Sequence, residues 1–326
     1  MKFLLLVWKG GVIERFGLLR NALVSLGNEA KPILHPRSEG PVEFHGETIN
    51  DKLSLKMLGK LKPDYIILWN GDLPKDDIVK NWAIKSDIPI IYVEMGWFPQ
   101  EKTVYFDFRG VNASSEIRGI KLKRVSLYQR KKLHMFLQKY HQEMNLYGNK
   151  LPSDFIFVPL QVETDSNILK NSAIKTMKGL VERVASIFKD EIIIVRPHPK
   201  HPDVKLGRIP NMCVDTSSDL HNLVKKARVV VGINSTVLLE ALTYFKPVVA
   251  LGEGLFSNHN VLIEGRDLTN AEIIHEIKKL ISKEKKARIE DFLYELIFKR
   301  TYYNEHLSDS SMVKNSHWYK KISRRL

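Results

Sequence analysis

The sequence predicts an α/β protein with two domains, each built on a largely parallel β-sheet, followed by C-terminal helices. Short apolar runs alternate with helical patterns along most of the chain, as in parallel sheets with helical crossovers. The chain has 326 residues, more than most domains with a single hydrophobic core contain. We therefore expect two Rossmann-like domains.

The first half of the chain fits one such domain. The expected strands are 3–7, 33–34, 64–69 and 89–93, and the expected helices are 14–26, 51–61 and 76–85. Gly27 follows the first of these helices and favours a left-handed C-cap. The segment 94–115 has no regular period and predicts a long loop, a common place for functional residues.

The second half repeats the alternation after a break at Gly148-Asn149 and Pro152. A basic helix is expected over 123–147, just before the break. The expected strands are 155–159, 191–195, 212–214, 228–231 and 247–251, and the expected helices are 168–188, 218–226, 236–244, 270–281 and 288–299. These features predict domains at 1–150 and 151–300, with 301–326 as a basic tail that contains Trp318 and Tyr319.

The composition restricts the partners and the compartment. The net charge is +14, which favours anionic partners such as nucleotides and phospholipid surfaces. Cys213 is the single cysteine, so no internal disulfide can form and a reducing, cytoplasmic location is expected. Lys9 interrupts the short first apolar run, which argues against a signal peptide, and no run is long enough to span a bilayer. Neither a D-x-D motif in a plausible site nor a zinc-ligand spacing occurs, so no metal is expected.

Two predicted strands end in polar groups that suit a phosphate. The run 192–195 leads into R-P-H-P, in which Pro197 and Pro199 hold His198 rigidly beside Arg196. An imidazole and a guanidinium both bind phosphate, although His198 also fits a structural role at a strand end. Because ligands bind at the carboxyl edge of such sheets, we favour the functional interpretation.

The second of these strands leads into Asn234-Ser235-Thr236 and then a helix that carries Glu240. Hydroxyl groups before a helix either cap it or bind an anion there. Glu240 lies one turn after Thr236 and fits either a nucleoside hydroxyl or a lysine. His198 on the same predicted edge favours phosphate binding at Ser235 and Thr236.

Two other segments supply candidate side chains for the sugar and the acceptor. Gln161, Glu163 and Asp165 would share one face if the backbone were extended, although Asp165 or Ser166 could equally cap the next helix. Carboxylates there suit a nucleophile or a base in glycosyl chemistry. The 94–115 loop offers the acceptor-side candidates Glu94, Trp97, Arg109, Asn112 and Ser114. Trp97 or Tyr105 would stack on a sugar, unless Trp97 fills the core.

The order of these motifs resembles that of the capsule polysaccharide biosynthesis family, and within it bacterial β-Kdo transferases (Kdo is 3-deoxy-D-manno-oct-2-ulosonic acid). The resemblance lies in P-L-Q-V-E-T-D-S, R-P-H-P, G-I-N-S-T-V-L-L-E-A-L and K-P-V-V-A-L-G, and in E-M-G-W-F-P with G-V-N-A-S-S. It covers roughly residues 94–254. It implies a GT-B fold, with two Rossmann-like domains facing a central cleft, and a CMP-sugar donor without a further cofactor.

The resemblance also implies roles for single residues. His198 with Ser235 and Thr236 would bind the CMP phosphate, and Asp165 would be the nucleophile of a retaining reaction, positioned by Gln161 and Glu163. Glu94 would lie near the glycan or glycolipid acceptor, and Arg109 or a lysine would meet the carboxylate of the sugar. The larger capsule enzymes carry two tandem transferase modules, whereas this sequence shows one.

Three alternatives remain open from the sequence. A CDP-glycerol phosphotransferase would use a similar His-Pro and Ser/Thr arrangement without a nucleophilic Asp165, and a nucleotide-sugar epimerase is a further enzyme. The third alternative, a nucleic-acid binder, would use the basic surface, but no nucleic-acid motif is present. The basic tail 314–326 favours peripheral contact with the anionic inner membrane instead.

Overall fold

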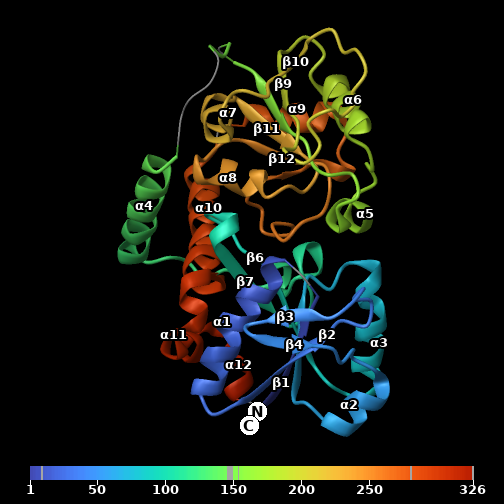
Figure 1. Ribbon diagram of the computed structural model, residues 1–326. Coiled ribbons are helices and arrows are strands. Elements are labelled where there is room, and N and C mark those ends of the chain that lie inside the picture. Colours follow the sequence, from blue (N-terminus) through green and yellow to red (C-terminus); the bar gives the residue numbers. More distant parts are fainter. Residues whose placement is uncertain (9, 145–149, 153, 280, 325–326) are drawn as a thin grey trace. The chain divides into compact units, whose positions relative to one another are not determined.

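The computed structural model divides the chain into two compact units (Figure 1). It describes all residues except 9, 145–149, 153, 280 and 325–326. The first unit consists of Met1–Glu116 and Leu296–Leu326, and the second consists of Ile117–Glu295. This division differs from the expected one, because the boundary lies at residue 116 rather than near 150 and the C-terminal residues belong to the first unit.

The first unit contains a six-stranded sheet in the order β14-β7-β6-β5-β1-β2. Its strands are β1 (Lys2–Val7), β2 (Glu29–Leu34), β5 (Tyr65–Trp69), β6 (Ile90–Met95), β7 (Thr103–Asp107) and β14 (Thr301–Tyr303). β7 is antiparallel to both of its neighbours, and the other pairs are parallel. A separate hairpin joins β3 (Val42–Phe44) to β4 (Glu47–Ile49), and the helices are α1 (Gly11–Ser25), α2 (Leu55–Leu61) and α3 (Asp77–Lys85).

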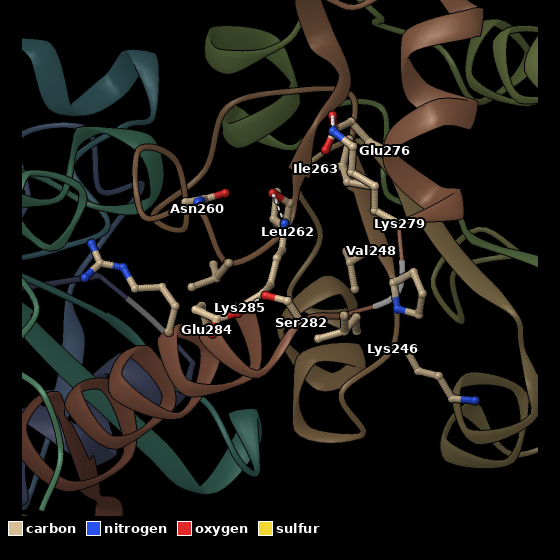
Figure 2. Close-up of a pocket in the computed structure, with 14 residues that line it drawn as sticks. Lys246, Val248, Asn260, Leu262, Ile263, Glu276, Lys279, Ser282, Glu284 and Lys285 are labelled. Atoms are coloured by element: carbon tan, nitrogen blue, oxygen red, sulfur yellow. Dashed lines mark hydrogen bonds and ion pairs between the residues drawn. The ribbon is translucent and has the colours of Figure 1, made fainter.

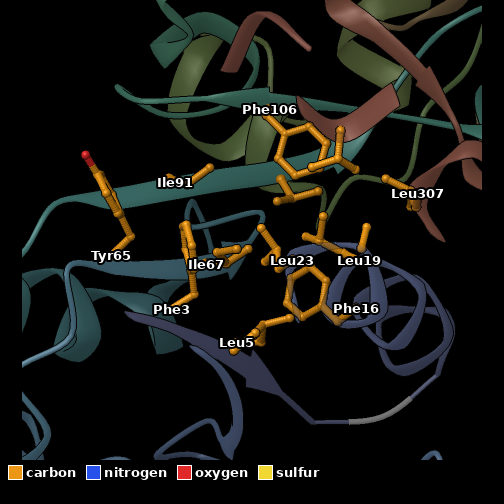
Figure 3. Packing of buried hydrophobic residues seen from close by; sticks show 14 of the residues in the cluster. Phe3, Leu5, Phe16, Leu19, Leu23, Tyr65, Ile67, Ile91, Phe106 and Leu307 are labelled. Carbon is orange, nitrogen blue, oxygen red and sulfur yellow. The ribbon is translucent and has the colours of Figure 1, made fainter. Parts of the chain in front are cut away.

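The C-terminal segment completes the core of the first unit instead of forming a tail. Its helices are α11 (Ser310–Asn315) and α12 (His317–Ser323). Trp318 is 1% exposed and stacks on Phe106 of β7, with the ring centroids 4.6 Å apart. Figure 3 shows Phe106 in this cluster, together with Phe3 of β1 and Phe16 of α1. The prediction that 301–326 is a basic tail outside the two domains is therefore wrong.

The second unit contains a parallel six-stranded sheet in the order β10-β9-β8-β11-β12-β13. Its strands are β8 (Ile156–Pro159), β9 (Ile193–Arg196), β10 (Met212–Val214), β11 (Val229–Gly232), β12 (Val248–Ala250) and β13 (Ile263–Glu264). The central strands are short, fully buried runs rich in Val and Ile, as expected where helices cover both faces of a sheet.

The helices of the second unit are α4 (Leu127–Gln142), α5 (Ser166–Asn171), α6 (Met177–Ile187), α7 (Leu220–Lys226), α8 (Val237–Thr243), α9 (Asn270–Lys278) and α10 (Lys283–Glu295). The expected helix 168–188 is two helices, because Ser172 is extended and Thr176 caps α6 by accepting from the backbone N–H of Gly179. Short 3-10 segments cover Pro74–Asp76, Gln100–Lys102, Asn112–Ser114, Glu116–Gly119, Gly265–Asp267 and Asn304–Ser308, and Leu296–Arg300 is π-helical.

Polar contacts to α10 place α4 in the second unit. The backbone N–H of Val125 donates to Asp291 at 2.9 Å, and His134 Nε2 lies 2.8 Å from Glu290. The expected helix 123–147 is thus part of this unit and not a connection, and its last residues, 145–147, lie outside the described residues. No helix among the described residues is both long and apolar enough to span a membrane.

Candidate functional site

Two strand ends of the second unit are joined by side-chain hydrogen bonds at the carboxyl edge of the sheet. Gln161, after β8, donates through Nε2 to Asn234 Oδ1 at 3.1 Å, and the Asn234 backbone N–H donates to Gln161 Oε1 at 3.2 Å. β8 and β11 are the neighbours between which the strand order reverses. Ligands of open α/β sheets bind at such a switch point.

Asn234 is fully occupied by hydrogen bonds within the protein. Its Nδ2 donates to the carbonyls of Asn167 and Glu253 at 2.9 and 3.0 Å, and its own carbonyl accepts from Asn167 Nδ2 at 3.2 Å. Asn234 is 4% exposed. The structure therefore gives Asn234 and Gln161 a positioning role that holds the turn at Ser235, and the ligand contact expected of them from the sequence stays a prediction.

His198 is presented as a neutral hydrogen-bond donor. Its Nδ1 accepts from the backbone N–H of Lys200 at 3.1 Å, so a neutral ring carries its hydrogen on Nε2. Burial lowers the pKa of the His198 imidazole, Lys200 and His201 lower it further, and Asp165 opposes them. The neutral ring at physiological pH offers one N–H to an anion, while the surrounding cations supply the positive charge.

Asp165 and Glu163 have separate local roles. Asp165 Oδ1 caps α5 by accepting from the backbone N–H of Asn167 at 2.9 Å, and its Oδ2 has no hydrogen-bond partner among the described residues. Glu163 accepts from the first backbone N–H of α6, that of Met177, at 2.6 Å. A turn at 162–165 replaces the extended backbone that would have placed Gln161, Glu163 and Asp165 on one face, so that expectation is wrong.

A pocket of about 530 Å³ lies between the segments that follow β8 and β9. Its lining residues are Gln161, Glu163, Thr164, Lys200, His201, Pro202, Asp203, Val204 and Lys205. Lys200 and His201 also raise the local positive potential at His198. The wall carries both signs of charge: Lys200, Lys205 and His201 suit an anionic group, whereas Glu163 and Asp203 suit hydroxyl groups or a cation.

Ser235 and Arg196 have different roles at the carboxyl edge of the sheet. Ser235 Oγ accepts from the backbone N–H of Val237 at 3.2 Å, which leaves its hydroxyl hydrogen for another acceptor, and Thr236 has the helical conformation. β8 separates the strands that lead to His198 and Ser235, so two strand spacings, about 10 Å, lie between those strands. Arg196 donates to the carbonyl of Ser218 and thereby fixes the start of α7.

Glu240 turns towards α4. Its Oε1 accepts from the hydroxyl of Tyr140 at 2.9 Å, whereas Oε2 is buried without a hydrogen-bond partner among the described residues. Burial raises the pKa of Glu240 to about 7, against the effect of the Tyr140 hydrogen bond. An oxygen in this state accepts a hydrogen bond from a hydroxyl group if one reaches it.

In the first unit, Glu94 is held at the carboxyl end of β6. Asn70, just after β5, donates through Nδ2 to Glu94 Oε2 at 2.6 Å, and the Met95 backbone N–H donates to Oε1 at 2.8 Å. Asp76 accepts from the backbone N–H of Gly71 at 3.1 Å and shapes the same turn. The sequence prediction did not include Asn70 or Asp76 as site residues. The sequence contains a signal for Asn70, because Asn70-Gly71 directly follows an apolar run that predicts a strand.

The segment 94–115 is more ordered than the loop expected from the sequence, because it contains β7. Trp97 is 3% exposed and stacks on buried Tyr105 at 4.5 Å, so almost none of either ring is available to a sugar. Buried Asp107 organises the following turn by accepting from the backbone N–H groups of Arg109 and Gly110.

Of the other acceptor-side candidates, Arg109 and Ser114 are exposed, and Asn112 is half-buried. The Asn112 backbone N–H donates to the Tyr105 hydroxyl at 3.0 Å. Arg109 has no side-chain partner among the described residues and remains the candidate for a sugar carboxylate.

A second pocket, of about 450 Å³, lies at the amino edge of the second sheet (Figure 2). It is lined by residues before β12 and β13 and by the start of α10, including Lys246, Leu262, Ser282 and Lys285. None of the residues expected at the site lines it. In the described part of the chain, no group of three or more His, Cys, Asp or Glu side chains is arranged to hold a metal ion.

Comparisons with known proteins agree with this fold. The chain has a TM-score of 0.62 and 16% identity to the β-Kdo 2,7-transferase KpsC of Thermosulfurimonas dismutans, over 96% of this chain and 99% of that one. For the KpsC β-Kdo 2,4-transferase of the same organism the TM-score is 0.61 and the identity 12%, over 92% and 91% of the two chains.

At the sequence level, the chain is 27% identical to Protein FixF of Sinorhizobium fredii in an alignment 297 residues long, which covers 79% of this chain and 73% of the relative. The family model described as "Capsule polysaccharide biosynthesis protein" matches residues 100–303. This match covers more than half of the chain and includes the segments around Gln161, His198 and Asn234. The chain therefore belongs to the capsule polysaccharide biosynthesis protein family.

Proposed function

We propose that this protein is a glycosyltransferase of surface polysaccharide or glycolipid synthesis, which transfers Kdo or a related ulosonic acid from a CMP-linked donor with retention. Membership of the capsule family and the fold shared with two β-Kdo transferases support the reaction class. The observation that carries the proposal is the carboxyl edge of the second unit, where His198 offers a neutral N–H beside Lys200 and Asp165 has one oxygen without a hydrogen-bond partner among the described residues.

The donor phosphate fits the groups on this edge. His198 Nε2–H and the Ser235 hydroxyl donate to the phosphate oxygens of CMP, and Lys200 offsets the negative charge that develops as CMP leaves. Glu240 Oε2 accepts a hydrogen bond from a hydroxyl of the nucleoside. One such preorganised donor contributes about a hundredfold in rate, or roughly 3 kcal/mol.

The transfer then takes two displacements. Asp165 Oδ2 attacks the anomeric carbon as the bond from that carbon to the CMP oxygen breaks, which gives a glycosyl ester and free CMP. The acceptor hydroxyl next attacks the same carbon, its proton passes to a base, and the Asp165 carboxylate is released. Two inversions give net retention. In the first unit, Glu94 is the candidate base, because Asn70 and the Met95 N–H fix its carboxylate.

The choice of nucleotide tests the proposal most directly. We expect CMP and CDP, but not UDP or GDP, to raise the melting temperature of the purified protein. His198→Ala should weaken CMP binding at least about tenfold, because it removes a charge-assisted hydrogen bond. His201→Ala is the neighbouring control and should leave a larger share of the affinity. Equal stabilisation by all four nucleotides would contradict a cytidylate site.

A CDP-glycerol phosphotransferase is the alternative that the same geometry permits, since Asp165 would then only cap α5. Incubation with CMP-Kdo and with CDP-glycerol separates the two reactions. Release of CMP from CDP-glycerol with none from CMP-Kdo would replace the proposed donor.

A further inference from the structure

Helix α4 exposes large apolar side chains on the surface of the second unit. Leu127, Tyr128 and Met135 are 82%, 78% and 62% exposed. In Figure 1, α4 is the green helix beside α10. Single exposed apolar side chains are common, but several on one helix form a patch, and such patches mark interaction surfaces.

These side chains share one face of α4. With 100° between successive residues, Tyr128 and Met135 point in nearly the same direction, and Leu127 lies 100° from Tyr128. The opposite face is buried through Leu133 and Leu137, which pack within the second unit. Lys131, Lys132 and Lys139 lie on the exposed side with the apolar residues and are themselves exposed.

The charge around this face is mostly positive, and Glu143, 3.8 Å from Lys139, is an acidic side chain beside it. From residue 117 to residue 142 the sequence contains eight Lys and Arg residues and no Asp or Glu. The arginines of this stretch are paired within the unit, since Arg118, Arg124 and Arg130 form ion pairs with Glu253, Asp291 and Glu290. The lysines remain at the surface, so the exposed face combines apolar groups with positive charge.

We propose that the α4 face, defined as Leu127, Tyr128, Lys131, Lys132, Met135 and Lys139, binds the surface of an anionic phospholipid bilayer. The apolar side chains enter the boundary between headgroups and acyl chains, and the lysines pair with lipid phosphates. A tyrosine at the level of the headgroups suits this depth. A nucleic acid would satisfy the lysines but leave Leu127 and Met135 in water, so a bilayer is the better match. The proposal is independent of the donor and the reaction.

Co-sedimentation of the full chain with vesicles tests the proposal. We expect binding to vesicles that contain phosphatidylglycerol and little binding to pure phosphatidylcholine. Replacing Leu127, Tyr128 and Met135 by Gln should reduce binding at least about tenfold, because three apolar side chains lose their burial. Replacing Lys131, Lys132 and Lys139 by Gln should reduce it by a similar factor and remove most of its salt dependence.

Two matched controls lie elsewhere on the surface. Ile84→Gln removes an apolar side chain of α3 that is 78% exposed, and Lys314→Gln with Lys320→Gln removes charge from the C-terminal helices. Both should bind vesicles as the unchanged protein does. A fluorophore attached to Met135→Cys in a Cys213→Ser background should shift to shorter wavelength only with anionic vesicles.

Three results would overturn the proposal. The first is vesicle binding that survives the three apolar substitutions. The second is binding that disappears after nuclease treatment, which would show that a nucleic acid bridges protein and lipid. The third is a dimer in solution that only the apolar variant abolishes while vesicle binding is kept, which would assign the face to a second copy of this chain.

Discussion

The two sheets have similar strand-order reversals, but the chemistry at their carboxyl edges is opposite. In the second unit, Lys200 and His201 surround His198 and lower its pKa together with burial. In the first unit, burial, together with the carboxylates Asp72, Asp107 and Asp76, raises the pKa of Tyr92 to about 12. One edge therefore favours an anionic ligand, and the other favours cations or hydroxyl groups. The topology provides the place for a ligand, and a few side chains decide its charge.

The units also differ in how the chain builds them. The second is continuous in sequence, whereas the first needs the C-terminal residues. Arg300 and Lys321 both bind the Glu116 carboxylate. Residues 296–326 are therefore held to residues 1–116 by ion pairs as well as by packing. Four substitutions test these differences.

The largest effect is expected at the anionic-ligand edge. Asp165→Asn keeps the cap of α5 but removes the nucleophile, so transfer should fall at least about 10³-fold while CMP still binds. Initial rates with CMP-Kdo and CMP binding by calorimetry measure the two effects. The matched control is Asp219→Asn, because Asp219 caps α7 in the same way. Near-normal turnover of the Asp165 variant would remove the nucleophile assignment.

The next effect concerns the first unit alone. Trp318→Ala should lower the free energy of unfolding of that unit by about 3–5 kcal/mol, because it leaves a large cavity against Phe106. Urea unfolding followed by proteolysis, with fragments identified by mass, reports each unit separately. The control is Tyr128→Ala, which removes an aromatic side chain that is 78% exposed. A second unit that loses as much stability as the first would contradict the division.

Glu94→Gln tests the acidic edge. We expect kcat to fall about 10²-fold, the lower range for a general base, with CMP affinity unchanged. Asn70→Ala should act in the same direction but less strongly, since it frees the Glu94 carboxylate without removing it. Steady-state rates as a function of acceptor concentration separate this effect from acceptor binding. A loss confined to CMP affinity would place Glu94 with the donor.

The smallest effect is a pH dependence of stability. The pKa of Glu240 is raised from 4.5 to about 7, so the folded protein binds an extra proton between these values and stability falls as pH rises through them. Glu240→Gln should remove this fall, which is at most about 3 kcal/mol for one group. Urea midpoints at about pH 5 and about pH 8 for both proteins measure the difference. An unchanged slope in the variant would show that another group titrates.

The sequence predicted what depends on local patterns. The buried strands of both sheets and the polar residues that follow them, among them His198 and Asn234, could be read from apolar runs and what ends them. It did not predict contacts between distant residues. Trp318 was assigned to a basic tail because its partner Phe106 lies in β7, a strand within an aromatic segment that shows no alternation. Trp97 was a candidate for stacking on a sugar, because its burial follows only from its packing on Tyr105, which the sequence does not show.

Since the chain leaves the first unit at residue 116 and returns at residue 296, synthesis on the ribosome presents the units in an unusual order. The contiguous second unit can emerge and fold while the first still lacks its final strand and helices. Trp318 is translated after the whole of the second unit, so the sheet of the first unit starts to emerge before that unit but closes after it. A premature stop codon between residues 296 and 318 would therefore damage the unit that residues 1–116 begin.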